Sequence, residues 1–75
     1  MKTYQFTAQI EKDSETGLYI GIVPNVPGAH TQARTLDELH TNLKEVLSLC
    51  LKEMTKEELN AIPEFVGFQQ VKIAV

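Results

Sequence analysis

The sequence has few of the residues that cross-link a small protein or break its helices and strands. Its 75 residues include one cysteine, no tryptophan, three prolines and four glycines. A single thiol, Cys50, excludes an internal disulfide and a zinc site built from cysteines. The glycines are scattered, so there is no glycine-rich phosphate loop. A domain this small, without such staples, is expected to gain stability by forming a homodimer or a higher oligomer.

Long apolar runs and basic patches are also missing. No run approaches the ~20 residues that a membrane span needs, and the first residues lead into an alternating pattern, so we expect a cytoplasmic protein. The net charge is −3, and residues 35–75 carry four Lys against seven acidic residues. Direct binding to nucleic acid is therefore not expected, whereas a basic protein partner would be attracted to this acidic half.

Alternation of apolar and polar residues predicts three strands in the first half of the chain, at 4–10, 18–23 and 29–34. The second strand is apolar on both faces, which is typical of a central strand or of one whose second face is covered by another chain. The third strand carries small residues on one face, which leaves room for a helix. Pro24 and the Pro27–Gly28 pair predict turns between the second and third strands.

The second half of the chain predicts a long helix. Thr35 is a good N-cap, and Glu38 three residues later predicts a capping box. Apolar residues then follow helical spacing from Leu36 to Met54 along about five turns. A short helix is expected at residues 56–61, and the alternation of Val71, Ile73 and Val75 predicts a final strand within residues 65–75.

These elements predict a single α+β domain over residues 1–75. Their order is β-β-β-α-β, with one long helix packed on one face of a mixed four-stranded sheet. A right-handed crossover would place the last strand parallel to its neighbour.

The residues that carry chemistry do not gather into an active site. The acidic residues fall in turns and on polar helix positions, so we expect no enzyme activity and no metal or cofactor site. Cys50 lies within the apolar helix positions, where a thiol behaves as a small hydrophobic group. His40 also falls among apolar positions, either as a histidine at the edge of the core or as a partner contact.

The candidates for binding a protein partner are Tyr19, His30, Gln32, Arg34 and Leu49. His30, Gln32 and Arg34 share one strand face, which is either a solvated edge or a contact surface. Arg34 would be its anchor, because a guanidinium pairs well with carboxylates and carbonyls. Leu49 lies on the polar side of the helix, and it would mark a patch only if it lay near Tyr19 or Val23.

One continuous run resembles the HicB-like antitoxins. Residues 17–38 read GLYIGIVPNVPGAHTQARTLDE, which matches a tyrosine-bearing strand, a Pro-x-x-Pro-Gly loop, a Thr-Gln pair and a helix opened by Thr-Leu-Asp-Glu. The helix body at 42–47 and the last residues, 71–75, also look like that family.

The resemblance implies a truncated ribonuclease-H-like fold without nuclease activity. It also implies a protein that neutralises HicA, a small mRNA-cleaving toxin. Many members carry a C-terminal DNA-binding domain, which is not expected in this chain. The alternative is a homo-oligomeric structural or regulatory domain that has no toxin partner.

Overall fold

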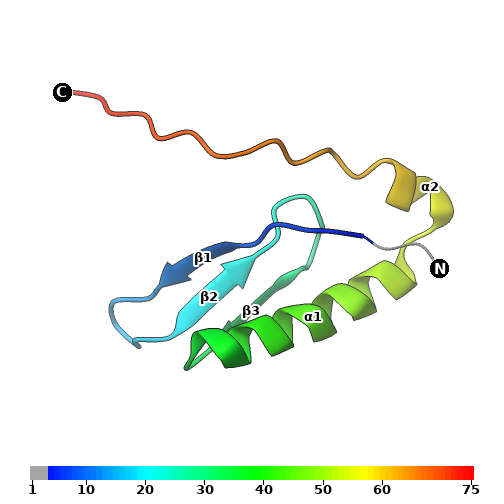
Figure 1. Ribbon diagram of the computed structural model, residues 1–75, viewed down its shortest axis with the longest axis horizontal. Helices are drawn as coiled ribbons and strands as arrows, with labels where there is room; N and C mark the ends of the chain where they lie inside the picture. The colour runs from blue at the N-terminus through cyan, green and yellow to red at the C-terminus, as the bar shows by residue number, and fades with distance from the viewer. Residues whose placement is uncertain (1–3) are drawn as a thin grey trace.

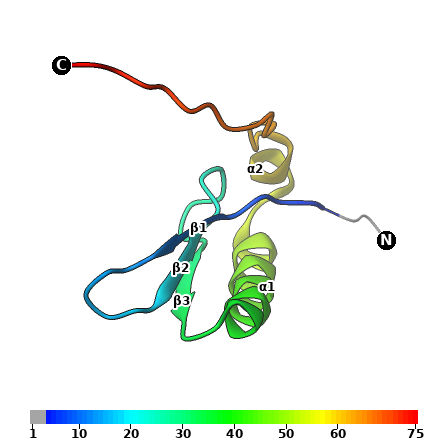
Figure 2. The ribbon, with the colours of Figure 1, turned by 60° about the vertical axis from the view of Figure 1, so that its left-hand side comes forward.

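The computed structural model describes residues 4–75, and residues 1–3 lie outside the described part. Three strands come first, β1 (Gln9–Lys12), β2 (Tyr19–Ile22) and β3 (His30–Ala33). Two helices follow, the long α1 (Leu36–Glu53) and the short α2 (Lys56–Asn60). The strands form one antiparallel sheet of order β1-β2-β3, and α1 covers one of its faces (Figures 1 and 2). The predicted α+β class and the long helix are confirmed.

The β1–β2 hairpin closes on a turn that is bonded by its own side chains. The Asp13 carboxylate accepts hydrogen bonds from the Thr16 hydroxyl at 2.6 Å and from the Thr16 N–H at 3.0 Å. Gly17 follows with φ +74°, in the left-handed region that glycine adopts without steric cost. The resulting register pairs Gln9 with Ile22 and Lys12 with Tyr19.

The connection between β2 and β3 is made of two successive turns. The Val26 N–H donates to the Val23 carbonyl, and the Ala29 N–H donates to the Val26 carbonyl. Each turn has a proline in its second position, and Gly28 supplies the positive φ, +80°, that the second turn requires. Because the turns repeat every three residues, Val23, Val26 and Ala29 all point into the protein and are almost fully buried.

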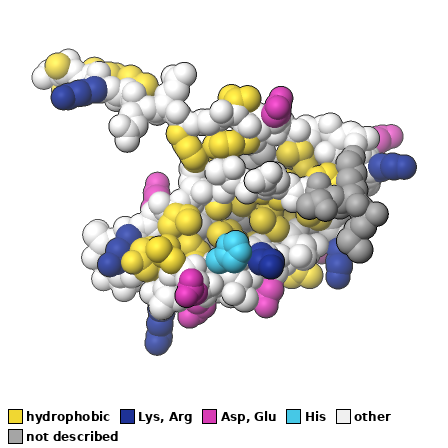
Figure 3. Space-filling view, in the orientation of Figure 1, with side chains coloured by type: hydrophobic (Ala, Val, Ile, Leu, Met, Phe, Trp, Pro, Cys, Tyr) yellow, Lys and Arg dark blue, Asp and Glu magenta, His cyan; other side chains and the backbone are white. Residues whose placement is uncertain are grey.

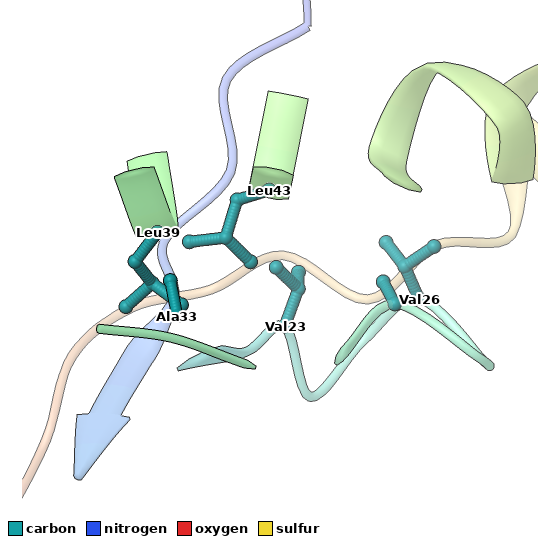
Figure 4. Packing of buried hydrophobic residues seen from close by; sticks show 6 residues of the cluster. Val23, Val26, Ala33, Leu39 and Leu43 are labelled. Atoms are coloured by element: carbon teal, nitrogen blue, oxygen red, sulfur yellow. The ribbon is translucent and has the colours of Figure 1, made fainter. Parts of the chain in front are cut away.

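The hydrophobic core lies between α1 and the strand face beneath it. The side chains of Leu39 and Leu43 on α1 pack onto Ala33 and Val23 (Figure 4). The helix sits very close to β2 at Gly21, where an added Cβ would lie 3.1 Å from a Leu43 methyl carbon. The small residues predicted on one face of β3 are confirmed in this role, since Ala29 and Ala33 are buried.

Each helix is capped by the threonine that precedes it. The Thr35 hydroxyl accepts a hydrogen bond from the Glu38 N–H at 3.1 Å and so caps α1, which is one of the two bonds of the capping box predicted there. Thr55 and Glu58 form a complete capping box, in which each side chain bonds the backbone of the other residue. This reciprocal bonding explains how α2 forms over only five residues.

The first strand differs from the prediction in its position. Strand pairing was expected over residues 4–10, whereas β1 spans Gln9–Lys12. The pairing to β2 stops at Gln9 because its partner, Ile22, is followed by the turn at Pro24. Residues 4–8 therefore run past the end of β2, although Phe6 and Ala8 still pack against the core.

Within residues 4–75 the sheet has three strands and residues 65–75 form none, so the predicted four-stranded sheet is not confirmed. These residues have the alternation of a strand but lie away from the sheet as an extended segment (Figure 1), and no backbone hydrogen bond joins them to the rest of residues 4–75. The start of the segment is tied elsewhere, since the Asn25 side-chain amide donates to the Pro63 carbonyl at 3.2 Å.

Candidate functional site

The sheet face opposite α1 is the candidate binding surface. Side chains alternate across a sheet, and those of Tyr19, Gly21 and Val23 are directed toward α1. Ile20 and Ile22 therefore point the other way. No helix or strand covers that side of the sheet in the described part of the chain (Figure 2). We call this side the open face.

The strand register brings residues from all three strands together on the open face. Ile20 is paired with Glu11 on one side and with Gln32 on the other. Ile22 is likewise paired with Gln9 and His30. Directly paired residues of an antiparallel sheet point to the same face. The result is a central apolar stripe with polar and charged side chains along both flanks.

The apolar stripe is accessible to a partner. The Ile22 side chain is 40% exposed and Ile20 is half-buried. Leu18, one step before β2 on the same alternation, is also half-buried. An apolar centre with a polar rim is the usual anatomy of a protein–protein interface.

Three of the predicted contact residues belong to this surface. His30 and Gln32 lie on β3 with exposed side chains. Arg34 directly follows β3 at the next alternate position and is also exposed. The predicted shared face of these three residues is therefore present, and it adjoins the apolar stripe of β2.

Tyr19 and Leu49 lie elsewhere. The Tyr19 ring is on the α1 side of the sheet, where it packs against the core and has the Lys12 ammonium 5.5 Å from its centroid. Leu49 is 61% exposed on α1, beside Lys44, Glu45 and Ser48. The structure therefore does not bring Tyr19 or Leu49 together with the three residues beside the open stripe.

A second candidate region, which is concave, lies at the β1 edge of the sheet, between residues 4–10 and α1. This groove of about 500 Å³ is lined by apolar side chains, including Phe6, Ile10 and Leu47, and by His40 at its rim. The side chain of His40 is exposed beside this groove. We call this region the edge groove.

Sequence reasoning identified the polar flank of the open face but missed the edge groove. The signal for the groove was present in the sequence, because Phe6 and Ile10 share one face of an alternating segment with two further apolar residues. The helix contacts mainly β3 and, to a smaller extent, β2, so it leaves the β1 side open.

The charges at the two ends of the molecule are held by local hydrogen bonds. The Thr16 hydroxyl and N–H lower the pKa of Asp13, and the Thr55 N–H and hydroxyl lower the pKa of Glu58. Across residues 4–75, no three His, Cys, Asp or Glu side chains gather in a way that would hold a metal ion. In the same part of the chain, no helix has the length and apolar character to cross a membrane.

Comparison with known proteins identifies close relatives from bacteria and archaea. A UPF0150 protein of Thermotoga maritima is 47% identical over 68 residues, which cover 91% of this chain and 88% of the relative. A UPF0150 protein of Synechocystis is 42% identical over 73 residues, covering 97% of this chain and the whole relative. A third, of Archaeoglobus fulgidus, is 44% identical over 69 residues, covering 92% of this chain and 94% of the relative.

No family model and no solved structure matches the chain. The relatives themselves are matched along nearly their full lengths, at identities well above 30%. The chain belongs to the UPF0150 family.

Proposed function

We propose that this protein is an antitoxin-like binding module that neutralises a small mRNA-cleaving toxin of the HicA type. The observation that carries the proposal is the open face, where an uncovered apolar stripe is flanked by His30, Gln32 and Arg34. The resemblance of residues 17–38 to HicB-like antitoxins names the class of partner. The proposed fold includes a fourth strand, which would give the mixed sheet of that family.

The proposed mechanism is occlusion of the surface with which the toxin binds RNA. Ile20 and Ile22 would form the desolvated centre of the contact, and Arg34 would pair with carboxylate or carbonyl groups of the toxin. A toxin that binds RNA is basic, because it must neutralise phosphates. The acidic residues exposed on α1 and α2, such as Asp37 and Glu57, would speed its association.

The first test is co-expression with the small protein encoded beside this gene. We expect the neighbour to arrest growth on its own, and we expect this chain to restore growth and to co-purify with it. A neighbour that is harmless, or one that is toxic but neither bound nor neutralised, would contradict the proposal.

A pair of matched variants locates the contact. Ile22→Lys places a charge on the open face, whereas Asn60→Lys adds the same charge at the exposed end of α2. We expect the first to abolish growth rescue and the second to retain it, with equal helix content by circular dichroism. Leu49→Lys examines the α1 surface in the same assay, and loss of rescue by that variant alone would move the contact from the open face to the helix.

The second candidate is a homo-oligomeric structural or regulatory domain without a toxin. Exposed apolar side chains along residues 65–75 favour this possibility. A stable oligomer beside a harmless neighbour would support it over the antitoxin.

A further inference from the structure

The C-terminal segment, residues 65–75, is too apolar and too exposed for an isolated chain. Val66, Val71 and Ile73 are 90%, 74% and 73% exposed, and Phe68 is 59% exposed. In the space-filling view the segment protrudes from the body and carries hydrophobic side chains on either side of its single lysine, Lys72 (Figure 3). Exposed apolar groups gathered in this way mark an interaction site.

The size of the whole chain indicates how much surface is available for burial. Its accessible surface is 6541 Å², whereas a folded monomer of this mass exposes about 4,600 Å². The radius of gyration is 14.4 Å, against about 11 Å for a compact domain of this length. The excess surface exceeds the ~800 Å² that each partner contributes to a standard interface.

We propose that residues 65–75 add a fourth strand to the sheet of a second copy of this chain, reciprocally, in a strand-exchanged dimer. Backbone pairing would supply the hydrogen bonds that this extended segment lacks within residues 4–75 of its own chain. Val71, Ile73 and Val75 share one side of the strand and would point toward an apolar surface, while Lys72 and Ala74 would point away.

The structure favours the β1 edge as the receiving site. At the other edge of the sheet, the Asn42 side-chain amide of α1 donates to the Gln32 carbonyl of β3 at 3.3 Å and so occupies one of its edge groups. An edge strand such as β1 presents unpaired backbone groups that can accept a new strand. The edge groove lies directly beside β1, with Phe6, Ile10 and Leu47 positioned to receive alternate side chains.

The attachment of the segment favours exchange between chains over pairing within one chain. Residues 62–65 line a hollow with Tyr4, Phe6 and Pro24, and the Pro63 carbonyl is bonded to Asn25. The Phe65 and Phe68 rings also contact each other edge to face, with centroids 5.0 Å apart, around Gly67 at φ +148°. The Asn25–Pro63 bond and the hollow hold the start of the segment against its own body, while the remainder leads away from it (Figure 1).

The first experiment measures the mass of the purified chain in solution. We expect a dimer at micromolar concentration by light scattering after size exclusion. Ile73→Asp should shift the mass to that of a monomer. Leu49→Asp, at a side chain of similar exposure on α1, should leave the dimer intact. A wild-type monomer at 100-fold higher concentration, or a dimer that survives Val71→Asp/Ile73→Asp, would overturn the proposal.

Cross-linking then separates exchange from pairing within one chain. In a Cys50→Ala background, Glu11→Cys and Lys72→Cys, which would lie on the same face of the extended sheet, are placed on two differently tagged chains, which are mixed, refolded and treated with a short bismaleimide. A product joining the two tags is expected. If no such product forms, and a chain carrying both cysteines cross-links only to itself, the segment pairs with its own sheet and the proposal is wrong.

Hydrogen exchange supplies a third readout that is specific for the receiving edge. We expect amides of Gln9–Lys12 that are not bonded to β2 to exchange at least tenfold more slowly in the dimer than in the Ile73→Asp monomer. The helix content of the two should be equal. Equal exchange at β1 in both forms would exclude this edge. The proposal does not depend on the antitoxin function, because every measurement uses this chain alone.

Discussion

The two faces of β2 are both apolar but have different surroundings. β2 is apolar on both sides, yet Gly21 lies against Leu43 while Ile22, the next residue, is 40% exposed. The difference comes from the neighbouring strand, because β3 contributes small residues to one face and long polar ones to the other. A helix can approach only the face with small residues. Hydrophobicity therefore does not distinguish the covered face from the open face here, whereas side-chain size on the adjacent strand does.

The largest expected effect is that of emptying the covered face. Leu43→Ala should lower the free energy of unfolding by about 2–5 kcal/mol, because it leaves a cavity between α1 and β2. Leu49→Ala removes the same atoms from an exposed position on the same helix and should change it by less than about 0.5 kcal/mol. Urea denaturation measures both variants. Equal losses would mean that α1 is rotated relative to the sheet.

A smaller effect is expected from filling the close contact between β2 and α1. Gly21→Ala should cost about 1 kcal/mol, because the new methyl group lies 3.1 Å from a Leu43 methyl carbon. Combined with Leu43→Ala, the same methyl group would occupy part of the cavity, so the double variant should lose less than the sum of the two single losses. Additive losses in urea denaturation would show that the two residues are not in contact.

The smallest expected effect lies outside both faces, in the exposed turns. The pKa of Asp13 and that of Glu58 are lower in the folded chain than their usual values. Their stabilisation is therefore complete above the unfolded pKa, near 4, and is lost as pH falls through the lower folded value. The Tm should fall on acidification below pH 4, and Asp13→Asn should reduce this fall. If the Tm of Asp13→Asn falls on acidification as much as that of the wild type, other carboxylates cause the fall.

The local part of the fold could be predicted from the sequence, and the part that depends on more distant neighbours could not. Thr35 and Glu38 indicate the start of the helix from local sequence alone, and the small residues of β3 indicate where α1 packs. The strand predicted at 65–75 has equally good alternation but needs a partner edge, and sequence pattern does not say which chain supplies it.

The candidate site shows the same division between local and distant information. The common face of His30, Gln32 and Arg34 follows from alternation along one segment. The edge groove depends on where α1 lies across the sheet, and Tyr19 was placed among contact residues because either face of β2 was available to a partner. A pattern of period two divides residues between two faces but does not say which one is buried.

The loop from Val23 to Ala29 has a consequence for how this protein tolerates changes in length. Surface loops usually accept insertions. In this loop every third residue has a buried side chain, and the second turn begins at the residue where the first turn ends. One added residue would rotate Val26 or Ala29 out of the core and shift β3 against β2. The loop therefore fixes the number of residues between the two strands. Natural variation in chain length should occur in the hairpin at residues 13–17 instead.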